Sequence, residues 1–338
     1  MSTPINPIEV DPIQLQEDLL KRLQRYLLTA LPINRRFPKL KAAAMRELNN
    51  PSELVKGPYL EALPDYPKSK SLAELVEEGV LHPGFEGLHV EGQGELSEYR
   101  RPLHEHQETA IRSVVGGGEN VVVATGTGSG KTECFLYPIL DSLLKEESEH
   151  QPGIRAILVY PMNALANDQL YRRLVPMLAD QLQEHGITVG RFTGQTTPGK
   201  SREFFAESYL NDPFFKEMFG KEIPANWLLS RDEMLDTPPN VLVTNYAMLE
   251  HILLLPHNAG LFQKSALKFL VLDEVHTYCG AQATEVALLL RKLCSRYAAK
   301  ADIRCLATSA TLGAEADSQK NVLKFTSRLF GRKFSKVI

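Results

Sequence analysis

The sequence has few of the features that mark metal knuckles, disulfide scaffolds or membrane proteins. Only four cysteines occur in 338 residues, at positions 134, 279, 294 and 305, and no two of them have the CxxC spacing of a metal knuckle. Their spacing does not match a small secreted disulfide framework either. We therefore expect reduced thiols in a protein core, and we place no metal site on cysteine.

Long apolar runs are missing as well. No run approaches the roughly 18 residues that a membrane span needs, and residues 1–11 are too polar for a signal peptide. These two absences predict a cytoplasmic protein that has no membrane partner.

The sequence also lacks an excess of either charge. It has 38 lysines and arginines against 41 aspartates and glutamates, which gives a net charge of −3. Any contact with nucleic acid must then come from a local basic strip. Hydrophobic residues make up 43% of the chain and charged residues 23%, which is ordinary for a globular protein. At about 100 to 200 residues per domain, the length allows about two domains.

Residues 1–101 are expected to form a helical and irregular N-terminal extension. Apolar residues at helical spacing predict an amphipathic helix over residues 13–31, and they are Leu15, Leu19, Leu23, Tyr26 and Leu27. Packing of this helix on the main body is favoured over a partner interface. Between residues 51 and 95, extended pieces and a helix near 71–79 predict a collar around the next domain.

Residues 102–338 show the pattern of an α/β domain, with a mostly parallel sheet flanked by helices. Short apolar runs predict six strands, at 120–124, 155–160, 187–192, 240–244, 268–272 and 303–308. Residues 196–239 read as an insertion, and a helix over 315–330 precedes a basic tail. Ligands of such sheets bind beyond the carboxyl ends of the strands, so the residues that follow each run are the candidate site residues.

A glycine-rich loop follows the first of these strands. Residues 125–132 read TGTGSGKT and match a P-loop in which Thr125 replaces the usual first glycine. In such a loop, backbone N–H groups surround phosphate oxygens, Lys131 reaches the β and γ phosphates, and Thr132 ligates Mg²⁺. The expected nucleotide contacts are Thr127, Gly128, Ser129, Gly130, Lys131 and Thr132. The alternative is a chance glycine turn, which the flanking strand and helix disfavour.

Two carboxylates follow another apolar run, Phe269–Leu272. Asp273 would hold Mg²⁺, directly or through water, and Glu274 would position and deprotonate the attacking water of an ATPase. An isolated apolar run followed by Asp-Glu is common and favours a structural explanation. Its coincidence with a P-loop predicts an ATP-hydrolysing site that uses ATP and Mg²⁺.

The tetrad DEVH at residues 273–276 resembles motif II of the DEAD/DEAH-box, superfamily 2 helicases, and TSAT at residues 308–311 is similar to their motif III. The resemblance implies a RecA-like domain and adds His276 to the catalytic residues. It also implies that Ser309 and Thr311 contact the His276 region and couple the ATP state to the nucleic-acid side. Alone, a TSAT tetrad would be interpreted as a helix cap or a turn.

The stretch LHEHQ at residues 103–107 resembles the Q motif of the same family. Its glutamine reads adenine through the side-chain amide, and this role falls on Gln107. The amide could equally cap a helix, so both interpretations stay open.

The remaining motifs would contact nucleic acid. YPMNALANDQ at residues 160–169 resembles motif Ia, a Thr-Gly pair follows it, and TNY at residues 244–246 resembles motif Ib. The resemblance assigns to nucleic acid Pro161, Asn163, Thr193, Gly194, Thr244 and Asn245. Hydroxyls, amides and helix N-termini of this kind hold phosphates without reading sequence. Four nearby cations would add electrostatic pull, although solvated surface charge is favoured for each: Arg172, Arg173, Lys200 and Arg202.

Aromatic residues stand out in the insertion at residues 196–239. They are Phe204, Phe205, Tyr209, Phe214, Phe215, Phe219 and Trp227. Aromatic rings stack on unpaired bases in some nucleic-acid-binding proteins. Four-residue spacings favour instead the buried face of a small helical unit.

Four stretches together resemble a narrower group of large bacterial helicases, with mitomycin-repair and phage-defence (Druantia-type) members. The stretches are YPMNALANDQ, VTNYAMLE, VLDEVHTYCGAQ and VKGPYLE. This resemblance implies action on DNA, with antiviral defence as one role of the group, and a second RecA-like lobe. Superfamily 2 motors hydrolyse ATP between two lobes. Nothing after Thr311 resembles the second lobe, so we expect it in the same longer protein or in a partner subunit.

The leading hypothesis is the ATP-binding lobe of an ATP-dependent DNA helicase or translocase, an enzyme that couples ATP hydrolysis to strand movement. One alternative is a non-motor subunit that binds nucleic acid or protein and keeps ATP as a structural ligand. An RNA helicase is the other, because backbone contacts barely distinguish the two sugars unless a 2′-hydroxyl is read.

Overall fold

The structure is a computed structural model that describes residues 11–30, 36–48, 50, 65–88, 97–126, 128–146, 152–262, 265–297, 303–310 and 316–338. The chain divides into two compact units, Met1–Asp65 and Tyr66–Ile338. Parts of the expected collar, at 51–64 and 89–96, lie outside the described residues. Thr127 and Thr311, which the sequence assigns to the nucleotide and coupling sites, also lie outside them.

The N-terminal unit contains two helices, α1 (Pro12–Ala30) and α2 (Pro38–Leu48). The helix expected over residues 13–31 is therefore confirmed. The side-chain amide of Gln24 on α1 donates to the carbonyl of Leu48, at the end of α2, at 2.8 Å. The packing of α1 on the main body stays a prediction.

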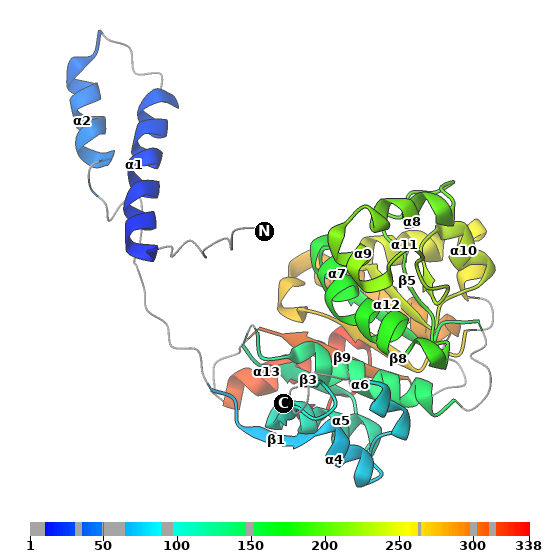
Figure 1. The fold of residues 1–338 in the computed structure, drawn as a ribbon. Coiled ribbons are helices and arrows are strands. Elements are labelled where there is room, and N and C mark those ends of the chain that lie inside the picture. The colour runs from blue at the N-terminus through cyan, green and yellow to red at the C-terminus, as the bar shows by residue number, and fades with distance from the viewer. Residues whose placement is uncertain are drawn as a thin grey trace, which may run out of the picture. The chain divides into compact units, whose positions relative to one another are not determined.

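The second unit is built on an eight-stranded sheet in which all neighbouring strands run parallel. The strand order is β10-β3-β9-β8-β4-β7-β5-β6. Figure 1 labels β3, β9, β8 and β5 of this sheet among the surrounding helices. The strands are β3 (Val121–Ala124), β4 (Ala156–Tyr160), β5 (Val189–Arg191), β6 (Trp227–Leu228), β7 (Val241–Asn245), β8 (Phe269–Leu272), β9 (Arg304–Ser309) and β10 (Lys336–Val337). All six strands predicted from the apolar runs are confirmed, because continuous apolar runs suit strands that are covered on both faces.

The strands that the sequence did not predict are short. Residues 336–337 form β10 on the outer edge of β3, where the N–H of Ala124 donates to the carbonyl of Ile338 at 2.7 Å. The expected basic tail therefore ends in an edge strand, which the sequence did not predict. A separate antiparallel pair joins β1 (Lys68–Ser71) to β2 (Pro102–His104). These strands have two to four residues and contain no continuous apolar run, which is the signal that marks the predicted strands.

Helices cover both faces of the large sheet, and the alternation of strand side chains divides the core in two. Leu158 of β4 packs in one cluster with α5 and α6, whereas Val159 packs in the other with α11, α12 and α13. The helices are α4 (Leu72–Glu77), α5 (Glu105–Val115), α6 (Lys131–Leu144), α7 (Asn163–Gln169), α8 (Arg202–Leu210), α9 (Pro213–Phe219), α10 (Arg231–Asp236), α11 (Tyr246–Leu254), α12 (Gly280–Tyr297) and α13 (Ala316–Phe330). Within the described residues, none of the helices combines the length and the apolar character that crossing a bilayer requires.

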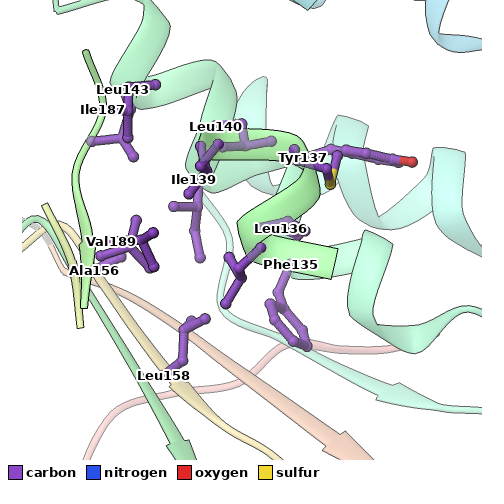
Figure 2. Close-up of a cluster of buried hydrophobic side chains, with 14 of the residues drawn as sticks. Phe135, Leu136, Tyr137, Ile139, Leu140, Leu143, Ala156, Leu158, Ile187 and Val189 are labelled. Carbon is purple, nitrogen blue, oxygen red and sulfur yellow. The ribbon is translucent and has the colours of Figure 1, made fainter. Parts of the chain in front are cut away.

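Figure 2 shows how α6, the helix that follows the glycine-rich loop, packs against the sheet. Leu136 and Ile139 of α6 share one buried cluster with Leu158 of β4 and Val189 of β5, and none of the four is more than 1% exposed. Burial of an aliphatic side chain of this size is worth about 1.5–3 kcal/mol. This packing anchors α6 on the sheet, and the glycine-rich loop leads into the first turn of this helix.

The described residues 66–88 and 97–101 belong to the second unit. The helix expected near 71–79 is confirmed as α4, whose Leu75 is completely buried. Phe85 is also completely buried, and its ring centroid lies 6.0 Å from that of Tyr137 on α6. The compact unit therefore begins ahead of the boundary that the sequence places at residue 101.

The insertion at residues 196–239 forms a small helical unit of α8, α9 and α10 beside β6. Phe205, Phe215 and Trp227 are buried, which confirms the core interpretation for these three rings. Phe204 and Phe214 are exposed by 50% and 47%.

The burial of Phe85 leads to a stability prediction. We expect Phe85→Ala to lower the free energy of unfolding by about 3–5 kcal/mol, because it removes a fully buried ring and leaves a cavity against α6. Urea unfolding followed by circular dichroism measures this change. Phe214→Ala is the matched control on an exposed ring and should change the free energy by no more than about 0.5 kcal/mol. If Phe85→Ala and Phe214→Ala lowered the free energy of unfolding equally, Phe85 would not be part of the core of the second unit.

Candidate active site

Three neighbouring strands end at one point and bring the predicted nucleotide-site residues together. β9 lies between β3 and β8 in the sheet. Ala124, the last residue of β3, pairs with Ser309, and Leu272, the last residue of β8, pairs with Ala307. The glycine-rich loop, the Asp-Glu pair and the end of β9 therefore leave the same edge of the sheet.

Two glycines give the loop its path. Gly128 and Gly130 have φ angles of +77° and +79°, in the left-handed region that favours glycine. A Cβ atom at Gly130 would come within 2.2 Å of Nε2 of Gln107, so no side chain fits there. Ser129 is buried, and its hydroxyl oxygen lies 2.6 Å from that of Thr125. These contacts hold the loop against the start of α5.

Lys131 and Glu274 meet in this pocket although they come from distant stretches of chain. Nζ of Lys131 donates to the carbonyl of Thr125 at 3.1 Å and lies 3.5 Å from Oε1 of Glu274. The two side chains are only 10% and 20% exposed, so their attraction is stronger than that of a surface pair. An ammonium group has three donors, so it can also reach a phosphate oxygen.

Asp273 is a buried carboxylate at the end of β8. Its N–H donates to the carbonyl of Val159 on β4 at 2.9 Å, and one carboxylate oxygen accepts a hydrogen bond from the hydroxyl of Thr308. Burial raises the pKa of Asp273 from 3.8 to about 6, and the charge of Glu274 raises it too, while Thr308 and Lys131 lower it. The site therefore holds a carboxylate whose negative charge is incompletely compensated.

Glu274 has a backbone conformation that is rare for its residue type. Its φ and ψ angles are 49° and 54°, and among the described residues it is the one non-glycine residue with positive φ. Its N–H donates to the hydroxyl oxygen of Thr308 at 2.9 Å, which holds the turn in place. Strain of this kind costs about 1–3 kcal/mol and concentrates at functional sites.

His276 contacts the end of β9 through its ring. The N–H of Ala310 donates to Nδ1 of His276 at 3.1 Å, so Nδ1 carries a lone pair and the ring proton sits on Nε2. Oε2 of Glu274 lies 3.2 Å from the same Nδ1, but two acceptors cannot bond to each other. Within the described residues this buried Oε2 has no hydrogen-bond donor.

The described contacts between the DEVH and TSAT stretches do not involve the Ser309 hydroxyl, and the predicted contact of Thr311 lies outside the described residues. The bonds to Asp273, Glu274 and His276 come from the hydroxyl of Thr308 and the N–H of Ala310. Ser309 is buried and lines a pocket that His276 also lines. The TSAT stretch predicted from the sequence does contact the DEVH stretch, but through Thr308, its first residue. The spacing alone does not show which of its three hydroxyls faces Asp273 and Glu274.

Gln107 is 2% exposed, and both ends of its amide are bonded within the protein. Nε2 donates to the carbonyl of Gly130 at 3.0 Å, and Oε1 accepts the N–H of His104 at 2.8 Å. The second bond is half of a capping box at the start of α5, which confirms the cap interpretation. Each end of the amide keeps one further bonding position, so the contact with adenine stays a prediction.

Thr132 is the first residue after Lys131 on α6, and its hydroxyl donates to Oε1 of Gln169 at 2.9 Å. Gln169 is the last residue of α7 and of the stretch that resembles motif Ia. No sequence pattern indicates this contact, because the two residues lie in different motifs.

These residues line one pocket of about 380 Å³. The pocket is lined by Arg101, His104, Gln107, Gly128, Gly130, Lys131, Thr132, Glu133, Leu165, Asp168, Gln169, Arg172, Arg173, Asp273 and Glu274. Arg172 and Arg173 thus face the predicted nucleotide side. Arg172 pairs with Asp168 at 2.9 Å, and Arg173 pairs with Glu133 at 3.1 Å. The other two cations lie in the insertion, where Lys200 sits over the ring of Phe204 and Arg202 pairs with Glu233 at 2.6 Å.

The residues predicted to contact nucleic acid follow the ends of three other neighbouring strands, β4, β7 and β5. Asn245, which ends β7, donates through Nδ2 to Oδ1 of Asn163 at 2.6 Å. Gly194 is exposed and Pro161 is partly exposed. The carboxyl edge of the sheet therefore has two halves. The predicted nucleotide residues lie at β3, β9 and β8, and the residues predicted to contact nucleic acid lie at β4, β7 and β5.

Two predicted hydroxyls of the second half are directed into the protein. Thr244 is completely buried and donates to the carbonyl of Phe192 at 2.8 Å. Thr193 is completely buried as well, and its hydroxyl oxygen accepts the N–H of Gln195 at 3.3 Å. In this structure neither hydroxyl is presented at the surface, in contrast to the expectation that both face phosphates.

Comparison with known proteins places these motifs in a family. The sequence profile of the DEAD/DEAH box helicase matches residues 104–211 and 215–318. The chain is similar to the Druantia protein DruE of Escherichia coli, with 34% identity over 348 residues that cover 79% of this chain and 19% of DruE. It is also similar to the uncharacterized ATP-dependent helicase YprA of Bacillus subtilis, with 30% identity over 62% of this chain and 23% of YprA.

Solved structures share the fold. The DUF1998 helicase MrfA bound to DNA matches 81% of this chain with a TM-score of 0.54, at 22% identity and over 29% of the MrfA chain. The DEAD-box helicase Mss116 bound to ssRNA and UDP-BeF matches 80% of this chain with a TM-score of 0.54, at 20% identity and over 46% of that chain. These likenesses support a RecA-like lobe.

The chain spans 19% of DruE and 23% of YprA, so it corresponds to one part of these longer relatives. The family profile nevertheless covers more than half of this chain, and it includes the glycine-rich loop and the DEVH tetrad. The chain belongs to the DEAD/DEAH box helicase family.

Proposed function

We propose that this chain is the ATP-binding lobe of an ATP-dependent helicase or translocase that acts on DNA. The observation that carries the proposal is the approach of Nζ of Lys131 to 3.5 Å from Oε1 of Glu274, in a pocket that Asp273 also lines. An ammonium group, two carboxylates and a glycine-rich loop are the groups that a triphosphate and its metal ion need. Membership of the family supports the use of ATP.

The donor set of the pocket fits Mg²⁺. Thr132 and Asp273 would hold the ion, because a hydroxyl and a carboxylate are the oxygen ligands that Mg²⁺ prefers. Burial outweighs the attraction of Lys131 in raising the pKa of Asp273, so a divalent cation beside this carboxylate would relieve the buried charge. When bound, Mg²⁺ would neutralise charge on the β- and γ-phosphate oxygens.

The protein groups have separate roles in this proposal. The N–H groups of the loop at Gly128 and Gly130 surround phosphate oxygens at the start of α6, and Lys131 contacts the β and γ phosphates. Glu274 orients the attacking water and accepts its proton, and its buried Oε2 has no other donor among the described residues. Gln107, which also lines the pocket, contacts adenine through its amide.

The second half of the carboxyl edge would bind the nucleic-acid backbone. Gly194, Asn163 and Asn245 supply backbone and amide groups of the kind that hold phosphates. Arg191, at the end of β5, is 8% exposed and has no carboxylate partner among the described residues. Its uncompensated positive charge would favour an anion nearby. The similarity to DruE supports the narrower helicase group that the motifs resemble, and the solved structure of MrfA, which shares the fold, contains DNA.

A second RecA-like lobe would complete the motor. Related enzymes obtain the arginine that stabilises the transferred phosphoryl group from outside the first lobe, an effect worth roughly 10³–10⁵ in rate. The chain spans less than a quarter of DruE and of YprA, which leaves room in such relatives for that lobe. We expect the lobe in the same longer protein or in a partner subunit, and slow turnover without it.

Two substitutions test the nucleotide site. Lys131→Ala should weaken binding of a fluorescent ATP analogue in the presence of Mg²⁺ by about tenfold or more, because it removes a charged contact with the phosphates. Glu274→Gln should leave binding nearly unchanged and slow DNA-stimulated hydrolysis by about 10²–10⁴, because it removes the base. Lys216→Ala and Glu222→Gln are matched controls on exposed residues. Unchanged binding and turnover in both site variants would reject the proposed roles.

The buried carboxyl of Asp273 predicts a pH dependence of stability in the absence of metal. Because its folded pKa of about 6 exceeds the ordinary 3.8, the folded state holds this proton more tightly than the unfolded state. The resulting stabilisation is complete below pH 3.8 and is lost as the pH rises through about 6. At pH 8 in EDTA, Asp273→Asn should therefore raise the free energy of unfolding by about 2 kcal/mol.

Urea unfolding at pH 8 and at pH 4.5 measures this effect. The advantage of Asp273→Asn should shrink at the lower pH, and added Mg²⁺ should stabilise only the unsubstituted chain. Asp232→Asn, on an exposed carboxyl, is the control and should change the free energy by no more than about 0.5 kcal/mol at either pH. An Asp273→Asn variant that is destabilised at pH 8 would show that the carboxylate is compensated in the folded protein.

The choice of DNA over RNA needs a direct comparison. We expect fluorescence anisotropy to show tighter binding of single-stranded DNA than of RNA of the same sequence and length, measured with ATP analogue and Mg²⁺ at one salt concentration. Equal or tighter binding of the RNA would favour the RNA helicase alternative.

A further inference from the structure

The hydrogen bond between Thr132 and Gln169 joins the proposed metal ligand to a helix of another motif. The hydroxyl of Thr132 donates to Oε1 of Gln169 at 2.9 Å, and both side chains line the pocket. Neither residue is fully buried, so the bond lies at the wall of the pocket rather than in the core.

A hydroxyl has one hydrogen and two lone pairs, and a metal ion can use only a lone pair. In a helix, a threonine hydroxyl commonly donates back to a carbonyl one turn earlier. The carboxylates of Asp273 and Glu274, which line the same pocket, would be other acceptors. Donation to any of these groups would turn the hydroxyl oxygen in another direction. Because Gln169 accepts the hydrogen from the side of α7, the lone pairs of Thr132 are left for the pocket.

Gln169 is held in place by the helix that carries it. α7 has only seven residues and spans about 10 Å. At its other end, Oδ1 of Asn163 accepts a hydrogen bond from Asn245 at 2.6 Å. α7 is therefore bonded at its first residue to the end of β7 and at its last residue to the start of α6. These two bonds restrict the position of the Gln169 side chain.

We propose that Gln169 is a positioning residue for the divalent cation: it takes the hydrogen of the Thr132 hydroxyl and turns the oxygen toward the metal. This inference rests on the proposed function, because it takes Thr132 as a ligand of Mg²⁺. Groups that orient a metal ligand in this way typically contribute about 10- to 100-fold to metal affinity. The bond also connects the metal to α7, whose other end lies among the residues proposed to bind nucleic acid.

The test uses the full 338-residue chain and binding of a fluorescent ATP analogue, titrated with MgCl₂ and repeated in EDTA. Gln169→Leu should raise the Mg²⁺ concentration for half-maximal effect about tenfold and leave binding in EDTA unchanged. Gln169→Glu keeps an acceptor that cannot donate, so its half-maximal concentration should equal or fall below that of the unsubstituted chain. Gln183→Leu, the same change on an exposed glutamine outside the pocket, is the control.

A double-mutant cycle separates positioning from general damage. In the Thr132→Ala background the hydroxyl is gone, so Gln169→Leu should cause no further shift in the Mg²⁺ concentration. Additive shifts would overturn the proposal, as would equal weakening in EDTA and in Mg²⁺, or a Gln169→Glu variant that behaves like Gln169→Leu. Should Gln169→Leu fail to fold by circular dichroism, Gln169→Asn, which withdraws the acceptor by one methylene, must show the same shift. Failure of the proposed function is distinct, because Lys131→Ala would then bind the analogue normally.

Discussion

The parallel pairing of β3, β9 and β8 is the constraint on which the site depends. Its register sets Ala124 beside Ser309 and Leu272 beside Ala307, so three loops begin at one level of the sheet. Each loop supplies something different: backbone N–H groups and a cation, two carboxylates, and the hydroxyl that joins them. None of these loops could hold its geometry alone, because their mutual distances are set by the interstrand hydrogen bonds beneath them.

The site keeps more negative charge than its own cation balances. Lys131 lies near Glu274, but burial of Asp273 is costly enough to raise its pKa to about 6. Glu274 adds a strained backbone and a buried carboxylate oxygen without a donor among the described residues. Such features are unfavourable for folding, and they are the features that a bound cation and a water molecule would satisfy. The helices on both faces supply the stability that offsets them.

Much of the fold follows from patterns that the sequence displays. The strands of the large sheet with three or more buried residues appear as apolar runs, and the motif residues stand at their carboxyl ends or directly after them. β6 and β10 have two residues each and carry no period, so only the folded chain reveals them. The sequence predicts which residue types form the site, but it does not predict their hydrogen-bond partners. That Thr308 bonds to Glu274, and that Gln169 bonds to Thr132, depends on the directions in which the side chains point. The burial of Thr193 and Thr244 escaped the motif comparison for the same reason.

The seam between the two halves of the carboxyl edge runs between β8 and β4, where the N–H of Asp273 donates to the carbonyl of Val159 at 2.9 Å. Val159 stands one residue before the end of β4, whose continuation leads into α7. If binding of a nucleic-acid backbone at the start of α7 shifted β4 along its axis, this hydrogen bond would move the peptide of Asp273 as well. A force on the nucleic-acid half of the carboxyl edge would then displace the Asp273 carboxylate in the other half.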